Sequence, residues 1–200
     1  MLKGADMKAK TTALGIPCLL ACLCLLLQAC DICGPAYPER DGRAYMERKG
    51  FPKELVEDVL GRKSLSHAHV VELSKCSDIN VRFLVGSNPN LKAEEIDLFI
   101  YASNDFVRSG AARNTSLAKE QMEKLFKDSS HTVYASLAGN PSVPEEMLLR
   151  LHKERKPGLL WFAMNPKCPE GIKAQIRASD DTLAQQWLSI TEGRAKGENR

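Results

Sequence analysis

Residues 87–95 read SNPNLKAEE, a turn followed by the start of a helix, and the chain repeats this arrangement. Related stretches are RNTSLAKEQ at residues 113–121, GNPSVPEEM at 139–147 and MNPKCPEG at 164–171. Aligning the four turns on Asn88, Asn114, Asn140 and Asn165 gives spacings of 26, 26 and 25 residues. A period of this size is typical of solenoids, in which each unit is one supersecondary structure stacked on its copies.

Each unit is predicted to be a short helix, a turn and a longer helix. In the first unit Val81, Leu84 and Val85 share one helix face, at positions i, i+3 and i+4. The turn asparagine tolerates the left-handed conformation that ends a helix, and a following proline cannot continue one. A side-chain oxygen then caps the next helix, whose N-terminus a nearby glutamate favours. The capping candidates are Asn90, Ser116 and Ser142.

The repeated pattern is Val-Arg-x-x-x-Gly/Ala-x-Asn-Pro-x-Leu-x-x-Glu. It resembles the pattern of the leucine-rich repeat variant family, which is loosely related to HEAT-type solenoids. The similarity covers about residues 53–190. It implies an all-α, right-handed α-solenoid of about five two-helix repeats. In the family one of the two layers is either α-helical or 3₁₀, and the sequence leaves both open for the short segments here.

Two arginines are candidates for a functional surface, because Val81-Arg82 and Val107-Arg108 keep the Val-Arg step of the family. Arg82 and Arg108 either line a partner-binding surface or form salt bridges to a neighbouring unit. Solenoids present extended concave surfaces to their partners. We therefore expect a non-catalytic protein-binding or scaffold module, and its partner is expected to be another envelope protein for the reasons given below.

The ends of the repeat are expected to be atypical. Residues 53–73 align one period before the first unit, with Arg62 in place of the turn asparagine, and residues 180–190 read as a last amphipathic helix. Residues 34–52 contain three prolines and three glycines without a clear period, so residues 30–52 are expected to form a flexible tether. The polar stretch at 191–200 is expected to be a disordered tail.

The N-terminus has the pattern of a secretory signal peptide. Residues 1–12 are basic, residues 13–29 carry no charge, and the start codon is either Met1 or Met7. Leu27-Gln-Ala-Cys30 resembles the lipobox of bacterial lipoproteins, although Gln28 fits its position imperfectly. The resemblance implies that residues 1–29 are removed and that Cys30 becomes the acylated first residue. Two or three acyl chains anchor a protein stably to a membrane.

The location implied by this resemblance is the bacterial cell envelope, on the periplasmic side. Asp31 follows the lipidated cysteine, and in enteric bacteria this residue resembles the signal that retains lipoproteins in the inner membrane. The inner membrane is therefore favoured over the outer one if the host follows that rule. The covalent lipid is the only prosthetic group that the sequence predicts.

Three other interpretations of the N-terminus stay open. It could be an uncleaved anchor or a plain signal peptide. It could also hold an iron–sulfur or redox centre, because five of the seven cysteines cluster there: Cys18, Cys22, Cys24, Cys30 and Cys33. Three of these cysteines lie in a leucine-rich run, where cysteine also serves as a small apolar residue.

Other chemistry has little support in the sequence. The net charge is +3, with no basic stripe interleaved with aromatics, which argues against nucleic acid. His67 and His69 are two residues apart and do not share a helix face, so we expect no metal site. An enzyme whose groups are scattered over several units stays possible. Cys76 and Cys168 are about three and a half repeats apart, too far for a disulfide if the units stack.

Overall fold

The computed structural model describes residues 37–195 of the chain. The regular secondary structure of this range consists of helices, without strands. The helices are α2 (Tyr37–Arg48), α3 (Lys53–Leu60), α4 (His67–Ser74), α5 (Ile79–Gly86), α6 (Ala93–Ile100), α7 (Asp105–Ala112), α8 (Lys119–Phe126), α9 (His131–Ala138), α10 (Glu145–Arg150), the π-helical turn η1 (Leu151–Arg155), α11 (Leu159–Ala163), α12 (Glu170–Ala178) and α13 (Thr182–Ala195). The predicted all-α solenoid of two-helix repeats is confirmed.

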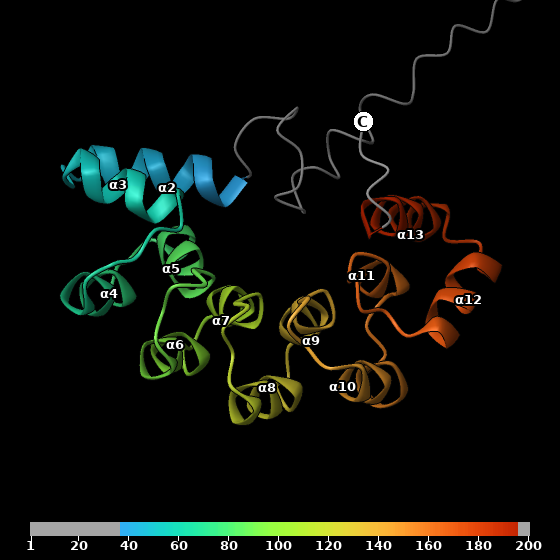
Figure 1. Ribbon diagram of the computed structural model, residues 1–200. Coiled ribbons are helices and arrows are strands. Elements are labelled where there is room, and N and C mark those ends of the chain that lie inside the picture. Colours follow the sequence, from blue (N-terminus) through green and yellow to red (C-terminus); the bar gives the residue numbers. More distant parts are fainter. Residues whose placement is uncertain (1–36, 196–200) are drawn as a thin grey trace, which may run out of the picture.

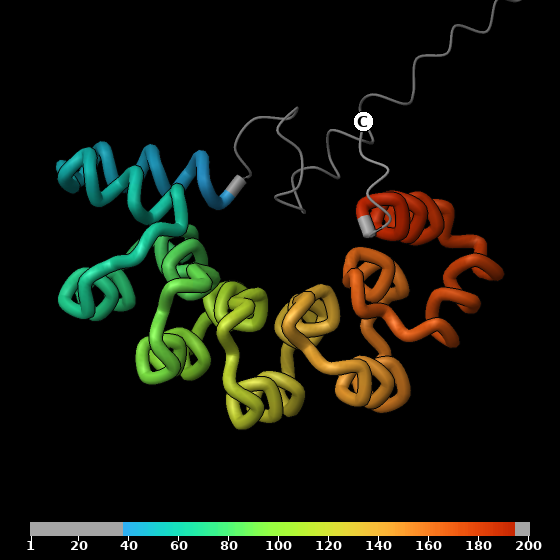
Figure 2. The backbone as a smooth tube through the Cα atoms, viewed as in Figure 1, coloured from blue at the N-terminus to red at the C-terminus, as the bar shows by residue number. Residues whose placement is uncertain are grey.

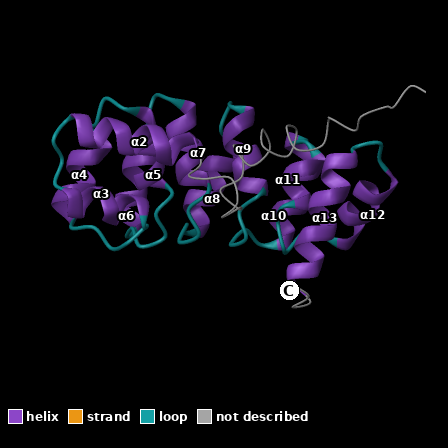
Figure 3. Ribbon diagram, turned by 90° about the horizontal axis from the view of Figure 1, so that it is seen from above, coloured by secondary structure: helices purple, strands orange, loops and turns teal. Residues whose placement is uncertain are grey.

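The helices form two layers that curve into an arc (Figure 1). Helices α5, α7, α9 and α11 form the inner layer, and α4, α6, α8, α10 and α12 the outer layer. From α4 to α13 the backbone alternates between the layers (Figure 2), and α2 and α3 lie side by side at one end of the arc. Seen from above, the inner helices stand side by side in one row, with α2 at one end and α13 at the other (Figure 3). Inner helices therefore pack on inner helices two elements away in the chain.

The core lies between the two layers and uses the same positions in each unit. Val81, Val107 and Val133, seven residues before the turn asparagines, are fully buried. Small residues let the backbones approach. A Cβ atom on Gly86 would lie 3.0 Å from the Phe99 ring of α6, and one on Gly110 would lie 2.6 Å from the carbonyl oxygen of Phe83 in α5. The spacing between α5 and α7 thus depends on the absence of a side chain at position 110.

A ladder of buried asparagines joins the units. The Nδ2 group of Asn114 donates to the carbonyl oxygens of Gly86 at 3.0 Å and Asn88 at 2.7 Å, both in the preceding unit. Asn140 donates in the same way to Ala112 and Asn114, each at 2.8 Å. Asn165 continues the series with donations to the carbonyl oxygens of Ala138 and Asn140. Asn88 ends the ladder by donating to the carbonyl oxygen of Lys63 at 2.8 Å.

The other end of each amide holds its own turn together. Asn88 Oδ1 accepts from the Asn90 backbone N–H at 2.9 Å, and the other three asparagines accept from the residue two positions later at 2.8–2.9 Å. Gly86, Ala112 and Ala138 are the last residues of α5, α7 and α9, whose terminal carbonyls lack partners within the helix. One amide thus closes a turn and satisfies the preceding unit's helix end.

Two details of the predicted turn are wrong. Among residues 37–195 that are not glycine, Arg62 and Lys156 have a positive φ. None of the four turn asparagines is therefore left-handed. The expected N-caps Asn90, Ser116 and Ser142 lie before the helices, whose first residues are Ala93, Lys119 and Glu145. These three polar residues stabilise the turns instead; for example, Asn90 Nδ2 donates to the Arg62 carbonyl oxygen at 2.7 Å.

The start of α6 and α8 is stabilised from the third helical residue rather than from the cap. Glu95 Oε2 accepts from the Lys92 N–H at 2.9 Å, and Gln121 Oε1 accepts from the Ala118 N–H at 3.0 Å. Both side chains are buried, and Gln121 also donates to the Ala93 carbonyl oxygen at 2.8 Å in the preceding unit. The third position thus serves as a second connection between units in the outer layer.

The predicted domain limits need two corrections. The tether expected over residues 30–52 is wrong from residue 37 onward, because α2 is helical and buries Met46 in the core. Gly42 lies close to α5, where a Cβ atom would come within 2.8 Å of Leu84 Cδ1. The tail expected at 191–200 is helical to Ala195 as part of α13. Both layers are α-helical in the described range, so neither is 3₁₀.

The fourth unit departs from the pattern. Helix α10 continues into the π-helical turn η1, which Lys156 ends with a φ of 51° and a 2.8 Å hydrogen bond from its N–H to the Leu151 carbonyl oxygen. Helix α11 then has five residues, against eight in α5, α7 and α9. Asn165 nevertheless makes the same two donations as the other asparagines. The ladder therefore keeps its register where the spacing is one residue shorter.

We predict that Asn114→Ala strongly destabilises the protein. The change leaves the buried Gly86 and Asn88 carbonyls and the Ser116 N–H without their partner. Each such group costs about 1–3 kcal/mol, so the free energy of unfolding should fall by about 3 kcal/mol or more in urea titrations. Thr115→Ala is the control, because the neighbouring Thr115 is exposed and its loss should change stability by less than about 0.5 kcal/mol. Equal stability of the two variants would contradict the role of the ladder.

Candidate functional site

The candidate site is the concave face of the arc, which we define by two positions in each inner helix. These positions lie eight residues and one residue before each turn asparagine, and they are seven residues apart, so they lie on the same side of a helix. The members at the first position are Asn80, Phe106, Thr132 and Pro157, and those at the second are Ser87, Arg113, Gly139 and Met164. Ser87 and Pro157 are buried, and the other six are half-buried or exposed. The residues three before each asparagine are fully buried. The inner helices border the open side of the arc (Figure 1).

An aromatic pair lies between α5 and α7. The Phe83 and Phe106 rings are stacked, with centroids 4.6 Å apart and planes 14° from parallel. The Arg113 guanidinium lies 5.9 Å from the centroid of the Phe83 ring, within the range of a cation–π contact. Phe83 itself is buried, while Phe106 and Arg113 are half-buried.

Burial changes the pKa values of Arg113 and of Arg62. Burial, together with the positive charge of Arg62, lowers the pKa of Arg113 to about 10. Burial also lowers the pKa of Arg62, and the carboxylate of Glu39 opposes that shift. Arg62 lies in the turn between α3 and α4 and has a left-handed φ of 50°. The sequence analysis identified Arg62 only as the residue that replaces the turn asparagine, and it did not identify Arg113. The one sequence feature that distinguishes Arg113 is that the other units have Ser, Gly or Met one residue before the turn asparagine.

Arg108 takes the second of the two roles that the sequence left open, a salt bridge between units. Its Nε and Nη2 donate to the two carboxylate oxygens of Asp128 at 2.7 and 3.1 Å, and its Nη1 donates to the carbonyl oxygens of Ala102 and Ser103. Arg82 is half-buried, and its Nε is buried without a hydrogen-bond partner. One period before Asp128 the chain has Ala102, so Arg82 lacks the corresponding carboxylate.

Asp128 connects three units. Besides accepting from Arg108, Asp128 Oδ1 accepts from the Ser130 N–H at 2.8 Å, and its backbone carbonyl accepts from Arg155. Burial by itself would raise the pKa of Asp128, but the hydrogen bonds from Arg108 and the Ser130 N–H outweigh it and hold that pKa below its usual value. The Arg155 guanidinium also lies over the Tyr134 ring, 4.4 Å from its centroid.

The histidines do not come together. His67 Nδ1 lies 3.0 Å from Glu95 Oε1. Burial tends to raise the pKa of Glu95, but the Lys92 N–H and the His67 ring lower it overall. His69 is exposed, and exposed His131 packs edge-on against Tyr134. Over residues 37–195, no three His, Cys, Asp or Glu side chains are grouped closely enough to hold a metal ion.

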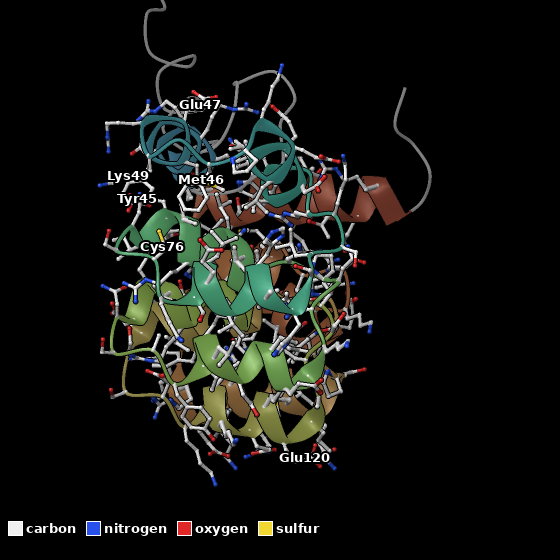
Figure 4. The ribbon with its side chains drawn as sticks, turned by 90° about the vertical axis from the view of Figure 1, so that its left-hand side faces the viewer. Tyr45, Met46, Glu47, Lys49, Cys76 and Glu120 are labelled. Atoms are coloured by element: carbon white, nitrogen blue, oxygen red, sulfur yellow. The ribbon has the colours of Figure 1, made fainter. Side chains whose placement is uncertain are left out.

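The cysteines of the repeat domain lie at opposite ends of the arc. Cys76 follows α4 and is half-buried, whereas Cys168 precedes α12 and is buried (Figures 1 and 4). Both are free thiols, and burial raises the pKa of Cys168 to about 11. Phe162 and Trp187 belong to the core, and Trp161 packs against it while half-buried.

Several predicted residues lie outside the described part of the chain. They are Cys18, Cys22, Cys24, Cys30, Asp31 and Cys33, so lipidation, sorting and the iron–sulfur alternative stay predictions. Within the part that is described, none of the helices has both the length and the apolar character needed to cross a bilayer.

The fold and the concave face define this chain as a helical-repeat protein of the α-solenoid type. Comparison with known protein families, curated proteins and solved structures found no match to it. Its assignment to this class therefore depends on the repeated turns, the two helical layers and the asparagine ladder.

We predict that Asp128→Asn destabilises the protein in a pH-dependent way. The change leaves the Arg108 guanidinium, 16% exposed in its side chain, without a counter-ion, and should cost about 1.5–3 kcal/mol at pH 7. Because the folded-state pKa of Asp128 is lowered, its contribution is complete above the unfolded pKa near 4 and is lost as the pH falls through the folded value. The difference from wild type should thus shrink between about pH 5 and pH 2.

Urea titrations at pH 7, 5 and 3 measure this effect. Asp180→Asn is the control, because Asp180 is exposed and its substitution removes the same charge at another place on the arc. A constant difference between wild type and Asp128→Asn over this range would show that the carboxylate charge does not stabilise the fold.

Proposed function

We propose that this protein is a lipid-anchored, non-catalytic binding module of the bacterial cell envelope. The observation that carries the proposal is the concave face, which successive units build from the same two positions of each inner helix. Its members differ in chemistry from unit to unit, from Asn80 and Phe106 to Arg113 and Met164. A regular frame with variable side chains is how solenoids recognise extended partners, and the partner we propose is another envelope protein.

The anchor belongs to the same proposal. The basic start, the uncharged run at 13–29 and the sequence Leu27-Gln-Ala-Cys30 support lipidation at Cys30. Asp31 favours the inner membrane in hosts that use it as a retention signal. The resemblance of the repeat to the leucine-rich repeat variant family supports a role in binding rather than in chemistry. Held at the periplasmic surface, the arc would present its concave face to membrane-associated proteins.

We predict that Cys30→Ala abolishes labelling of the protein by fatty-acid analogues and blocks cleavage before residue 30. Lipidation precedes cleavage in this pathway, so the variant should retain its signal sequence and run at higher mass. Cys33→Ala is the matched control and should be labelled and cleaved as the wild type. Mass spectrometry that finds an unmodified Cys30 at the start of the mature protein would refute the lipoprotein assignment.

Affinity capture from solubilised membranes tests the binding role. We predict that Thr132→Lys, on the concave face, removes the captured partner, whereas Leu98→Lys, on the outer helix α6, retains it. Both residues are exposed, and both changes add one positive charge. Loss of the partner with Leu98→Lys alone would place binding on the convex side.

A further inference from the structure

The joint between α9 and α11 differs from the other joints of the inner layer. Four residues before the turn asparagine, successive units have Leu84, Gly110, Ser136 and Trp161. At Gly110 this position faces the preceding inner helix, because a Cβ atom there would lie 2.6 Å from the Phe83 carbonyl oxygen of α5. The first three residues are buried, whereas Trp161 is half-buried. Helix α11 thus has the largest side chain of the series at the position where α7 has none.

Helix α11 meets α9 at the C-terminal end of α9. A Cβ atom on Gly139, the C-cap of α9, would lie 3.7 Å from the Trp161 ring and equally far from the Trp161 carbonyl oxygen. At the same end Asn165 donates to the carbonyl oxygens of Ala138 and Asn140 at 2.8 Å. Helix α11 is shorter than α9 and contacts it much less extensively than α9 contacts α7. The contact is therefore a pivot rather than a fully packed helix face.

Arg155 makes a second connection across this joint, from the π-helical turn η1. Its guanidinium donates to the backbone carbonyl oxygen of Asp128, which precedes α9, and lies over the Tyr134 ring of α9, 4.4 Å from the centroid. This contact is on the N-terminal half of α9, away from Gly139. It is imperfect, because Arg155 Nε is buried without a hydrogen-bond partner among residues 37–195. Lys156, which ends η1, also has a left-handed φ of 51°, which is unfavourable for a lysine.

The outer layer adds an ion pair to the same joint. Arg150 of α10 pairs with Glu123 of α8 at 2.6 Å, and its guanidinium lies over the Phe126 ring. The two charged side chains are 36% and 31% exposed, and ion pairs in contact with water contribute little and are screened by salt. Helices α8 and α10 also contact each other less than α6 and α8 do. Polar contacts therefore carry more of this joint than of the earlier ones.

The position of this joint divides the arc into two blocks. Solenoid units contact their neighbours alone, so the stability of the array is set joint by joint, and the stack opens first at its weakest interface. Helices α5, α7 and α9 pack closely in a row on one side of the joint, and α11 packs on α13 on the other side (Figure 1). The boundary lies between the better packed blocks α2–α9 and α10–α13.

We propose that the α9–α11 joint is a hinge of the arc and that Arg155 is its latch. The block α10–α13 turns about the pivot formed by Gly139, Trp161 and Asn165. Opening breaks the contacts of Arg155 with the Asp128 carbonyl and the Tyr134 ring, while the asparagine ladder stays intact. The distance between the two ends of the arc then changes, and with it the curvature of the concave face. The hinge does not rest on the proposed function, because the movement needs neither a partner nor the lipid.

Pulsed electron paramagnetic resonance on the full-length chain in detergent micelles measures this movement. Spin labels on p-acetylphenylalanine leave the native cysteines in place. Labels at Leu98 of α6 and Ile190 of α13 report across the hinge, and labels at Lys49 and Leu98 report within the block α2–α9. All three positions are exposed. The second pair thus shows whether a variant changes the hinge alone.

Arg155→Gln should open the hinge. The hinge places the open state at about 1–10% of wild-type molecules, so one main distance is expected for both pairs. Loss of the charged donor should raise the open population about tenfold, which gives a second distance between positions 98 and 190. The distance between positions 49 and 98 should not change. Arg43→Gln is the matched control, because Arg43 pairs with Glu57 at 2.8 Å away from the hinge, and it should give no second distance.

Two results would overturn the hinge. A single, unchanged distance across the joint in Arg155→Gln would show that the arc is rigid without the latch. A second distance for both label pairs would show that the whole stack loosens. If Arg155→Gln loses its helical circular dichroism, Tyr134→Leu decides, because it removes the ring and keeps the Arg155 hydrogen bond to Asp128. This variant should raise the open population about threefold, and an unchanged distribution would then refute the latch and the hinge with it.

Discussion

The structure depends on the buried side-chain amide of the turn asparagines, whose oxygen accepts hydrogen bonds and whose nitrogen donates them. Each turn asparagine accepts from the N–H two residues later. Asn114, Asn140 and Asn165 donate both of their hydrogens to carbonyls of the preceding unit, and Asn88 donates to the Lys63 carbonyl. One of those carbonyls is the last of an inner helix, which a short helix of eight residues cannot satisfy by itself. Aspartate has no hydrogens to donate, and glutamine is one methylene longer. Asparagine therefore fits the turn position because it satisfies buried backbone groups of its own turn and of the preceding unit.

This constraint fixes the distance and register between units, and the remaining side chains adapt to it. The glycine at 110 lets α7 approach α5, and the shortened fourth unit bends through a π-helical turn until Asn165 reaches its two carbonyls. Because the ladder and the core use one side of each inner helix, the other side is free to vary. The frame is therefore kept although Asn80, Phe106 and Thr132 differ at one position and Ser87, Arg113 and Gly139 at the other.

Charge is distributed unevenly over this frame. Arg108 reaches Asp128 and stabilises a contact between units, while Arg82, at the equivalent position, has no such carboxylate because Ala102 replaces it. Arg113 breaks the repeat at its position, where the other units have Ser87, Gly139 and Met164. The chain compensates the charge of Arg108 with Asp128, but it leaves the buried Nε of Arg82 without a hydrogen-bond partner.

The sequence by itself determined the helical repeat, its period and its core positions, because a hydrophobic spacing and a stop signal are local properties that recur. It also marked the four asparagines, but for the wrong reason, since a left-handed turn is a local explanation and the ladder joins residues about 26 positions apart. Helix α2 was missed because Gly42 and Pro38 within it, with further prolines and glycines on either side, favour a loop, and only the burial of Met46 and the packing of Gly42 on α5 override them. The salt bridge between Arg108 and Asp128 likewise needs the stacked units, because stacking alone brings α7 next to the turn that follows α8.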